Sequence, residues 1–265
     1  MDIGIVGLGV IGEACKYGFE KLGHTVSVHD IKFSTKIEDL LSTDITYICV
    51  PTPVDVDGGG GCDTSIVESV VHSLDELEYK GIVAIKSTVK PTTTEKLIGL
   101  TSLNLCFVPE FLRERCSISD FTENHDLLAV GTYSETVYEV VKRCHGNYPK
   151  SCEMLTPTEA EILKYYSNVY NALRIIFANE MYEICDHVGA DYTKIKDTFI
   201  KRGTTKDLYL DVNDNFRGYG GVCLPKDTKA LDAFVKEVGL DLKLFEMINT
   251  ENNKFKTTVF NGMRK

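Results

Sequence analysis

One thiol, Cys223, stands inside the decapeptide Gly-Tyr-Gly-Gly-Val-Cys-Leu-Pro-Lys-Asp at 218–227. The glycines before it allow the backbone to approach a ligand closely, and Pro225 restricts the chain after it. A cysteine between such a turn and the pair Lys226-Asp227 can act as a nucleophile where solvent and a favourable charge environment reach it. The alternative is a buried cysteine that packs as a small apolar residue. The decapeptide alone leaves both interpretations open.

A second candidate site lies at the N-terminus. Residues 3–6 predict a strand, Gly-Leu-Gly-Val-Ile-Gly follows at 7–12, and 13–21 predicts a helix. Residues 25–30 predict another strand, which ends in an acid. In a strand, G-x-G-x-x-G, helix unit the glycines allow a tight turn and the approach of a pyrophosphate, and the acid binds a ribose. This pattern predicts a dinucleotide site, the alternative being a glycine-rich turn in an unrelated α/β domain.

The acid that ends the second strand is Asp30. A carboxylate at this position accepts a hydrogen bond from the 2′-hydroxyl of NAD, so it favours NAD over NADP. Lys32 lies close in the sequence and weakens that preference.

Strands and helices alternate through the first half of the chain. Further strands are expected at 45–50, 82–86, 103–108 and 127–131, and further helices at 65–77, 92–98 and 134–144. The alternation predicts a parallel sheet with helices on both faces and ligands at the carboxyl ends of the strands. Five polar residues fall at such ends: Asp30, Thr52, Ser87, Thr88 and Glu110. Each of them could instead cap a helix or a turn.

The alternation stops near residue 150. We therefore expect an α/β fold with an NAD-binding Rossmann-type domain at 1–152 and an all-helical central domain at 153–265. The helical domain should begin with a long helix from 156 to 187. Shorter elements complete the prediction: helices at 192–200, at 228–238 and from 242 to the C-terminus, the last one interrupted by Asn249, Asn252 and Asn253, and a glycine-rich surface loop at 55–63.

Four polar residues of the long helix share one face. Glu161, Lys164, Asn168 and Asn171 are spaced by three, four and three positions. One interpretation is a solvated polar stripe. The other is that Lys164 and Asn168 point into a cleft between the two halves of the chain.

The composition argues against several classes of protein. The 265 residues carry a formal net charge of -10, which disfavours binding to nucleic acid or anionic membranes. No apolar run reaches the roughly 18 residues of a membrane span, and the N-terminus has no signal-peptide pattern. The nine cysteines are an odd number without a Cys-x-x-Cys pair, which argues against a disulfide framework or a metal site. A reducing cytoplasm fits this composition.

Several motifs occur together and in order: 7–12, Val-Pro-Thr-Pro at 50–53, Lys-Ser-Thr-Val at 86–89, Pro-Glu-Phe-Leu-Arg-Glu at 109–114, Glu-Ala-Glu-x-x-Lys-x-x-x-Asn at 159–168, Phe-Ala-Asn-Glu at 177–180, and 218–227. They resemble the motifs of the UDP-glucose/GDP-mannose dehydrogenase family, in its UDP-glucose 6-dehydrogenase group. The resemblance runs from Met1 almost to the C-terminus. It implies that the C6 hydroxyl of a nucleotide sugar is oxidised to a carboxylate with two NAD. UDP-glucose is favoured over GDP-mannose or an N-acetylated sugar.

The resemblance also implies a role for each motif residue. Cys223 would trap the aldehyde and form a thioester. Lys164 and Asn168 would stabilise the developing oxyanion, and Asp227 would orient or activate water.

Thr88, Glu110 and Glu114 would transfer protons and position the sugar or the nicotinamide. Contacts to NAD are expected from Gly7, Gly9, Val10, Ile11, Gly12, Asp30, Thr52, Thr88 and Glu114. Contacts to the substrate are expected from Glu110, Phe111, Leu112, Arg113, Lys164, Asn168, Tyr219 and Gly220.

The resemblance further predicts a homodimer through the long helix and a third, C-terminal nucleotide-binding domain that this sequence would lack. The family's Arg-Ile-Gly, which reaches a partner subunit's sugar, is not recognisable at 206–217. Two alternatives therefore stay open. One is a non-catalytic NAD-binding dimerisation module. The other is a two-electron alcohol dehydrogenase of the 6-phosphogluconate type, which the cysteine loop disfavours because one hydride transfer needs no thiol.

Overall fold

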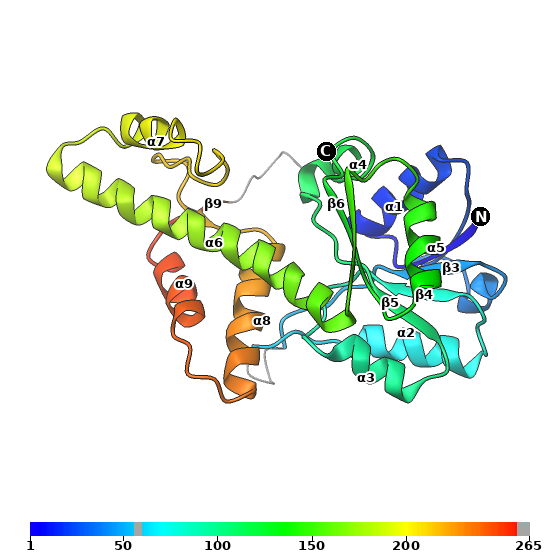
Figure 1. Cartoon of the computed structure of the whole chain (residues 1–265). Coiled ribbons are helices and arrows are strands. Elements are labelled where there is room, and N and C mark those ends of the chain that lie inside the picture. Colours follow the sequence, from blue (N-terminus) through cyan, green and yellow to red (C-terminus); the bar gives the residue numbers. More distant parts are fainter. Residues whose placement is uncertain (56–59, 259–265) are drawn as a thin grey trace. The chain divides into compact units, whose positions relative to one another are not determined.

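The computed structural model describes residues 1–55 and 60–258, and these form two compact units (Figure 1). The first comprises Met1–Pro53 and Cys62–Lys164. The described part of the second comprises 54–55, 60–61 and 165–258. Residues 56–59 of the expected glycine-rich loop and 259–265 of the expected final helix lie outside the described residues.

The first unit is built on a seven-stranded sheet with the order β2-β1-β3-β4-β5-β6-β7. All neighbouring strands are parallel except β5 and β6, which are antiparallel and share only the pair Phe107–Gly131. The Rossmann-type α/β fold is confirmed, but the expectation of a wholly parallel sheet is wrong at this one pairing. The strands are β1 Asp2–Val6, β2 Thr25–His29, β3 Ile45–Ile48, β4 Ile82–Ile85, β5 Asn104–Phe107, β6 Leu127–Gly131 and β7 Ser151–Leu155.

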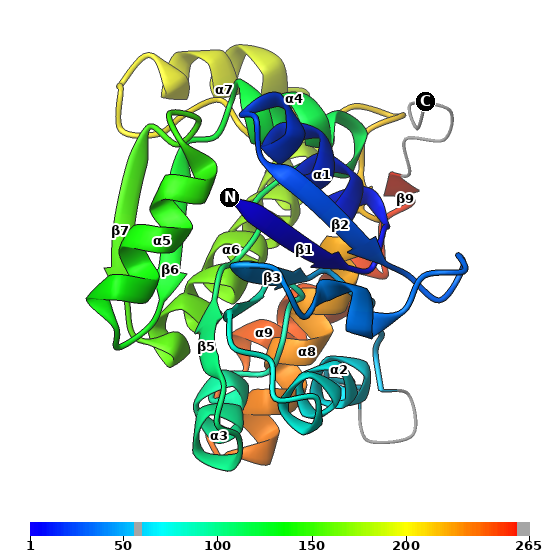
Figure 2. The ribbon, with the colours of Figure 1, turned by 90° about the vertical axis from the view of Figure 1, so that its right-hand side faces the viewer.

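Helices cover both faces of this sheet, because successive residues of its central strands point to opposite sides. Ile45 and Tyr47 pack with one set of helices, while Ile48 packs with the other. Figures 1 and 2 show α2 and α3 on one side of the sheet and α1 and α4 on the other. The helices are α1 Val10–Lys21, α2 Ser65–Glu76, α3 Thr93–Leu100, α4 Ser117–Thr122 and α5 Glu135–His145, with single 3-10 turns η1 Ile37–Leu40 and η2 Glu114–Cys116.

Strand β7 was not expected, and it crosses the predicted domain boundary at 152. It lies at the edge of the sheet and is largely exposed, so its sequence carries no apolar run that would reveal it. The helix α6, Pro157–Val188, then begins on the same unit, because Ala160 is fully buried in the core beneath α2 and α3. The compact units consequently divide at Lys164 rather than at 152.

The second unit is helical apart from the two-residue strands β8, Gly218–Tyr219, and β9, Thr257–Thr258. Its helices are the remainder of α6 with α7 Tyr192–Ile200, α8 Cys223–Glu237 and α9 Leu244–Asn252. The core contains Val169, Ala172 and Ile176 of α6, packed with Ile248 of α9.

Helix α8 begins at Cys223, five residues before the predicted start at 228. Pro225 made this stretch resemble a loop, yet proline is tolerated in the first turn of a helix, where its missing N–H has no intrahelical partner. The thiol therefore belongs to a helix N-terminus and not to a loop.

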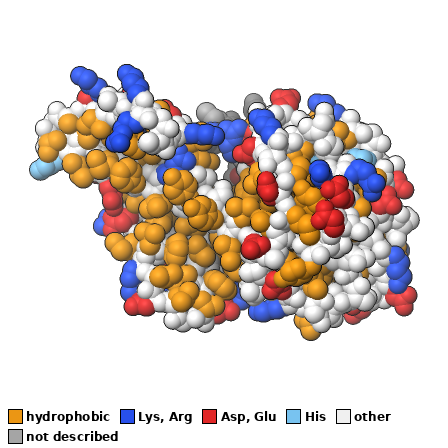
Figure 3. Space-filling model, viewed as in Figure 1, with side chains coloured by type: hydrophobic (Ala, Val, Ile, Leu, Met, Phe, Trp, Pro, Cys, Tyr) orange, Lys and Arg blue, Asp and Glu red, His pale blue; other side chains and the backbone are white. Residues whose placement is uncertain are grey.

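Helix α6 leaves a row of large apolar side chains exposed, which we call the α6 stripe (Figure 3). Tyr166 is 71% exposed and Val188 is 67% exposed. The members recur at helical spacing and are Ile162, Tyr166, Tyr170, Phe177, Ile184 and Val188. No helix in the described part of the chain combines the length and apolar character needed to cross a membrane.

Glu161 joins the start of α6 to helix α3. Its carboxylate accepts hydrogen bonds from the backbone N–H of Thr92 at 2.6 Å and of Thr94 at 2.7 Å. Helix α3 has no side-chain cap from its own N-cap residue, so Glu161 satisfies N–H groups that would otherwise lack a partner. Burial raises the pKa of Glu161 to about 7, against the effect of these hydrogen bonds.

We expect the Glu161 carboxyl to make stability depend on pH. Its folded pKa lies above that of an unfolded glutamate, so folding takes up a proton between the two values. The free energy of unfolding, relative to that of Glu161→Gln, should therefore rise by about 2–3 kcal/mol as pH falls from about 8.5 to about 5. Urea unfolding followed by circular dichroism measures this difference.

The matched control is Glu159→Gln, at an exposed position on the same helical turn. This variant should keep the wild-type rise towards low pH. An equal pH dependence in the wild type and in Glu161→Gln would contradict the prediction.

Candidate active site

The glycine-rich turn between β1 and α1 has the geometry of a phosphate-binding turn. Gly7 has a φ of +92°, and a Cβ there would lie 2.8 Å from the carbonyl oxygen of Cys49. A Cβ at Gly12 would collide with the carbonyl oxygen of Gly7, so α1 can pack against the turn only with glycine there. Gly9 is the N-cap of α1 and supplies no side-chain cap, which leaves the first amides of the helix, at Val10 and Ile11, open to an anion.

Asp30 lies at the carboxyl end of β2, beside this turn. Its carboxylate accepts hydrogen bonds from the N–H of Leu8 at 2.6 Å and of Lys32 at 2.8 Å. These two hydrogen bonds lower the pKa of Asp30 and keep it ionised. The dinucleotide interpretation of the turn and its acid therefore fits the residues present.

The strand ends of β4 and β5 carry a buried ion pair, Lys86 with Glu110. The ammonium nitrogen lies 2.9 Å from the carboxylate, and the two side chains are 1% and 8% exposed. The other carboxylate oxygen of Glu110 accepts hydrogen bonds from the N–H of Phe111 at 2.8 Å and of Leu112 at 3.2 Å. Glu110 thereby fixes the turn that leaves β5.

Both members of this pair stay charged. Burial opposes the charged form of each, but the Glu110 carboxylate raises the pKa of Lys86 above its usual range, and the Lys86 ammonium lowers the pKa of Glu110. A carboxylate held in this state accepts hydrogen bonds and does not donate a proton.

Lys164 belongs to the same cluster. It is 9% exposed, its ammonium donates to the carbonyl oxygen of Glu110, and it lies 5.6 Å from the ring centre of Phe111. Glu161, one turn earlier on α6, is fully buried. The interpretation of this face as a solvated polar stripe is therefore wrong for these two residues.

The remaining strand-end residues of the first unit are buried or partly buried. Thr52 is 7% exposed, and the hydroxyl of Ser87 donates to the carbonyl of Val50 at 2.7 Å. Thr88 is partly buried and its carbonyl accepts from the thiol of Cys62 at 3.3 Å.

Arg113 is engaged within its own segment. Its guanidinium donates two hydrogen bonds to Asp120 of α4, at 2.9 and 2.7 Å, and its N–H donates a third at 3.0 Å. Glu114 follows as the first residue of η2 and is partly buried.

The second unit brings together Asn168, Asp227 and the first turn of α8. The side-chain amide of Asn168 donates to Asp227 at 2.5 Å, and the ammonium of Lys226 lies 2.7 Å from the other oxygen of that carboxylate. Asp227 is completely buried, whereas Cys223, one helical turn before it, is exposed. The alternative of a buried structural cysteine at 223 is therefore wrong. An exposed thiol at a helix N-terminus, where the dipole favours negative charge, has the setting of a nucleophile.

The segment before the thiol is held by its own chain. Tyr219 is 4% exposed and Gly220 is partly buried. Arg217 donates to the side chain of Asn179 at 2.8 Å and forms an ion pair with Glu183, both on α6. Arg217, the arginine nearest the thiol in the sequence, is thus bound to residues of its own chain.

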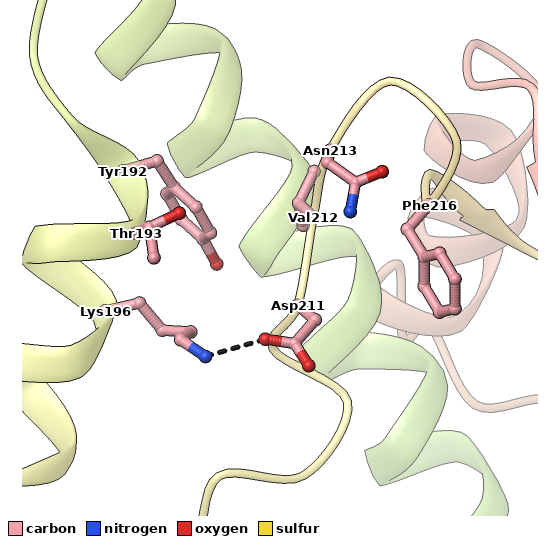
Figure 4. Close-up of a pocket in the computed structure, with 7 residues that line it drawn as sticks. All are labelled: Tyr192, Thr193, Lys196, Asp211, Val212, Asn213 and Phe216. Carbon is pink, nitrogen blue, oxygen red and sulfur yellow. Dashed lines mark hydrogen bonds and ion pairs between the residues drawn. The ribbon is translucent and has the colours of Figure 1, made fainter.

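A pocket in the second unit contains none of these residues (Figure 4). It has a volume of about 220 Å³ between α7 and the segment that precedes β8. Lys196 of α7 lines the pocket, and its ammonium donates to Asp211 at 2.6 Å and to Asp207 at 3.1 Å. The pocket is lined by Tyr192, Thr193, Lys196, Asp211, Val212, Asn213 and Phe216.

A Rossmann-type unit with this glycine-rich turn, and with an acid at the end of its second strand, is typical of an NAD-dependent dehydrogenase. Residues 27–148 match the NAD binding domain of the UDP-glucose/GDP-mannose dehydrogenase family, and residues 158–254 match the central domain of that family. The chain belongs to the UDP-glucose/GDP-mannose dehydrogenase family, and its cofactor is NAD.

Individual relatives agree with this assignment. UDP-glucose 6-dehydrogenase TuaD of Bacillus subtilis is 31% identical over 80% of this chain, and the match spans 47% of TuaD. UDP-glucose 6-dehydrogenase AglM of Haloferax volcanii is 27% identical over 93% of this chain and 68% of that protein. A solved UDP-glucose dehydrogenase from Pyrobaculum islandicum superimposes with a TM-score of 0.83 at 26% identity, over 96% of this chain and 68% of that one. The chain thus spans about half the length of TuaD and two thirds of the other two.

Sequence reasoning missed two members of the site region. Lys86 enters the sequence analysis only as part of a motif. A lysine directly after the apolar strand Ile82–Ile85 nevertheless indicates a buried ammonium that needs a carboxylate partner. Asn252 was treated as an interruption of a helix, and its contact with Tyr219 spans 33 positions, beyond the reach of periodicity.

Breaking the ion pair between Lys86 and Glu110 should strongly destabilise the first unit. Lys86→Met leaves the Glu110 carboxylate buried without its cation, which should cost about 3–5 kcal/mol of unfolding free energy. The double variant Lys86→Met with Glu110→Gln removes both charges and should recover part of that loss. Urea unfolding of the wild type, both single variants and the double variant measures the coupling.

The matched control is Lys80→Met, because Lys80 lies 3.8 Å from Glu78 in an exposed pair. It should leave the unfolding free energy unchanged. Single-variant losses that simply add in the double variant would show that the two charges do not depend on each other.

Proposed function

We propose that this chain oxidises the C6 hydroxyl of a nucleotide sugar to a carboxylate by two successive two-electron steps, with UDP-glucose as substrate and UDP-glucuronate as product. The observation that carries the proposal is the exposed thiol of Cys223 at the N-terminus of α8, one turn from the buried Asp227, which accepts a hydrogen bond from Asn168. The relatives named UDP-glucose 6-dehydrogenase support this choice of sugar.

The thiol explains why one site performs both oxidations. NAD, when bound at the glycine-rich turn, would supply the hydride acceptor for each of them. After the first, the Cys223 sulfur adds to the carbonyl carbon of the aldehyde, and the aldehyde oxygen takes a proton to give a thiohemiacetal. Loss of a second hydride and of that proton leaves a thioester. Water then adds to the thioester, and cleavage of the C–S bond releases the carboxylic acid and restores the thiol.

The polar residues of the motifs have complementary roles in this scheme. The Asn168 amide and the Lys164 ammonium donate to the oxygen that becomes negative when the thiol adds. Asp227, an acceptor bonded to Asn168 and Lys226, orients the hydrolytic water. The ion pair with Lys86 favours a positioning role for Glu110 and leaves proton transfer to Thr88 and Glu114.

Further roles follow the same proposal. Phe111, Leu112, Arg113, Tyr219 and Gly220 would contact the sugar nucleotide, and Thr52 the cofactor. A reducing compartment such as the cytoplasm stays a prediction from the cysteine content.

The stoichiometry of NADH formation tests the proposal. With UDP-glucose and NAD the wild type should form two NADH per sugar. Cys223→Ser should lower the rate of the complete reaction about 100-fold or more, because the covalent intermediate is lost. The matched control, Cys152→Ser, alters a partly buried cysteine of β7 to which no role is assigned, and it should keep both the rate and the stoichiometry.

Two other outcomes would replace the proposal. One NADH per sugar, insensitive to Cys223→Ser, would indicate the two-electron alcohol dehydrogenase. Retained NAD binding without turnover of UDP-glucose, GDP-mannose or an N-acetylated sugar would indicate a non-catalytic NAD-binding dimerisation module.

We also propose that the chain forms a homodimer through the α6 stripe. The stripe exposes large apolar side chains on one long helix, and the rings of Tyr166 and Tyr170 stack along it at 6.4 Å. A two-fold axis would place two such uncharged surfaces against each other.

The oligomeric state checks this second proposal. Phe177→Glu places a charge in the α6 stripe and should convert a dimer into a monomer at micromolar concentration in analytical ultracentrifugation. Ile195→Glu, at an exposed position of α7, is the control and should sediment as the wild type does. A wild-type protein that sediments as a monomer would contradict the proposal.

A further inference from the structure

We propose that Asn252 is a positioning residue for the thiol, because its side-chain amide fixes the backbone just before the turn that carries Cys223. Neither the sequence motifs nor the proposed mechanism assigns a role to this asparagine. The inference rests on the nucleophilic role proposed for Cys223.

Asn252 binds the backbone of Tyr219 at two points. Its carbonyl oxygen accepts from the N–H of Tyr219 at 2.8 Å, and its amide nitrogen donates to the carbonyl of Tyr219 at 3.0 Å. The side chain is 8% exposed, so water competes little for either hydrogen bond. One asparagine thus occupies both main-chain groups of a residue, as a neighbouring strand would.

The two hydrogen bonds from Asn252 to the backbone of Tyr219, which we call the Asn252 clamp, require a glycine at position 218. A Cβ at Gly218 would lie 2.7 Å from the side-chain oxygen of Asn252. Gly218 also pairs with Thr257 of β9, so this short strand is held by main-chain pairing and by the clamp. The first glycine of the decapeptide is therefore explained by the approach of Asn252 and not by a ligand.

The side chain of Tyr219 links the backbone segment bound by Asn252 to helix α8. Its side chain is 4% exposed and packs with Val169 and Ile248. Its hydroxyl lies 3.4 Å from the hydroxyl of Thr228 and 3.3 Å from the side-chain oxygen of Asn249. Thr228 is completely buried and follows Asp227, so the ring joins the strand before the thiol to the helix after it.

Only Gly220, Gly221 and Val222 separate this anchor from the thiol. Glycines tolerate many conformations, and Gly221 has a φ of +81°. Such a connection holds the thiol in one place only if both of its ends are fixed. The two hydrogen bonds of Asn252 fix one end, and the buried residues Asp227 and Thr228 in the first turns of α8 fix the other.

The test compares Asn252→Ala and Asn252→Asp with the wild type and with Asn253→Ala, an exposed neighbour. Alkylation of Cys223 by iodoacetamide in the native chain, followed by mass spectrometry, should be several-fold slower in both Asn252 variants, because the thiol leaves the helix N-terminus for part of the time. Alkylation of Cys116 is the internal reference and should not change. The kcat for UDP-glucose should fall about tenfold, with the KM for NAD unchanged.

Asn252→Asp adds a second measurement, the pH dependence of the Cys223 alkylation rate. This rate would not depend on the ionisation of residue 252 if Asn252 only stabilised the fold. Its ionised carboxylate repels the Tyr219 carbonyl, whereas the protonated form can donate to it. The ratio of variant to wild-type alkylation rates should therefore return towards one as pH falls. If Asn252→Ala does not fold, this near-isosteric variant decides alone.

The inference is overturned if the Asn252 variants unfold at a lower temperature yet alkylate Cys223 as Asn253→Ala does. Alkylation needs no substrate, so this result is separate from the fate of the proposed function. Full turnover in the Asn252 variants would overturn the inference and leave the nucleophilic role of Cys223 intact. Slower alkylation in a protein without turnover would support the inference while the proposed function fails.

Discussion

The ion pair between Lys86 and Glu110 is the interaction on which the first unit depends most. It joins the ends of two adjacent parallel strands, where a Rossmann-type sheet binds its ligands. The same carboxylate holds the amides of Phe111 and Leu112, and the carbonyl of Glu110 receives Lys164. Such a pair adds little net stability compared with apolar packing, but either charge alone would be costly. Its contribution is a fixed geometry at the edge of the sheet.

The second unit reaches fixed geometry through side-chain amides, apolar packing and one ion pair. The backbone of Tyr219 is held by an amide, its ring by apolar neighbours, and Asp227 by Asn168 and Lys226. These contacts come from α6, α8 and α9, so the thiol depends on residues far from it in the sequence. A glycine-rich turn gains order from such contacts because it has little conformational preference of its own.

Features with local causes could be predicted from the sequence, and features with distant causes could not. The turn at 7–12 and its acid were found because glycine spacing and strand patterns lie within one short stretch. Strand β7 was missed because an exposed edge strand carries no apolar run. The start of α8 was missed because Pro225 suggested a loop, although the first turn of a helix accepts proline. Lys86 and Asn252 act on residues 24 and 33 positions away, at distances where no periodicity applies.

Helix α6 has a consequence for how this protein can be divided. The boundary between the compact units falls after Lys164, within a continuous helix of 32 residues. A fragment that stops before this helix would uncover the core around Ala160 and would leave the amides of Thr92 and Thr94 without their acceptor. A fragment that keeps only its first two turns would rely on a helix too short to be stable alone. Exchange of the second unit by gene fusion therefore has to carry the whole of α6, because a cut inside this helix would damage both units.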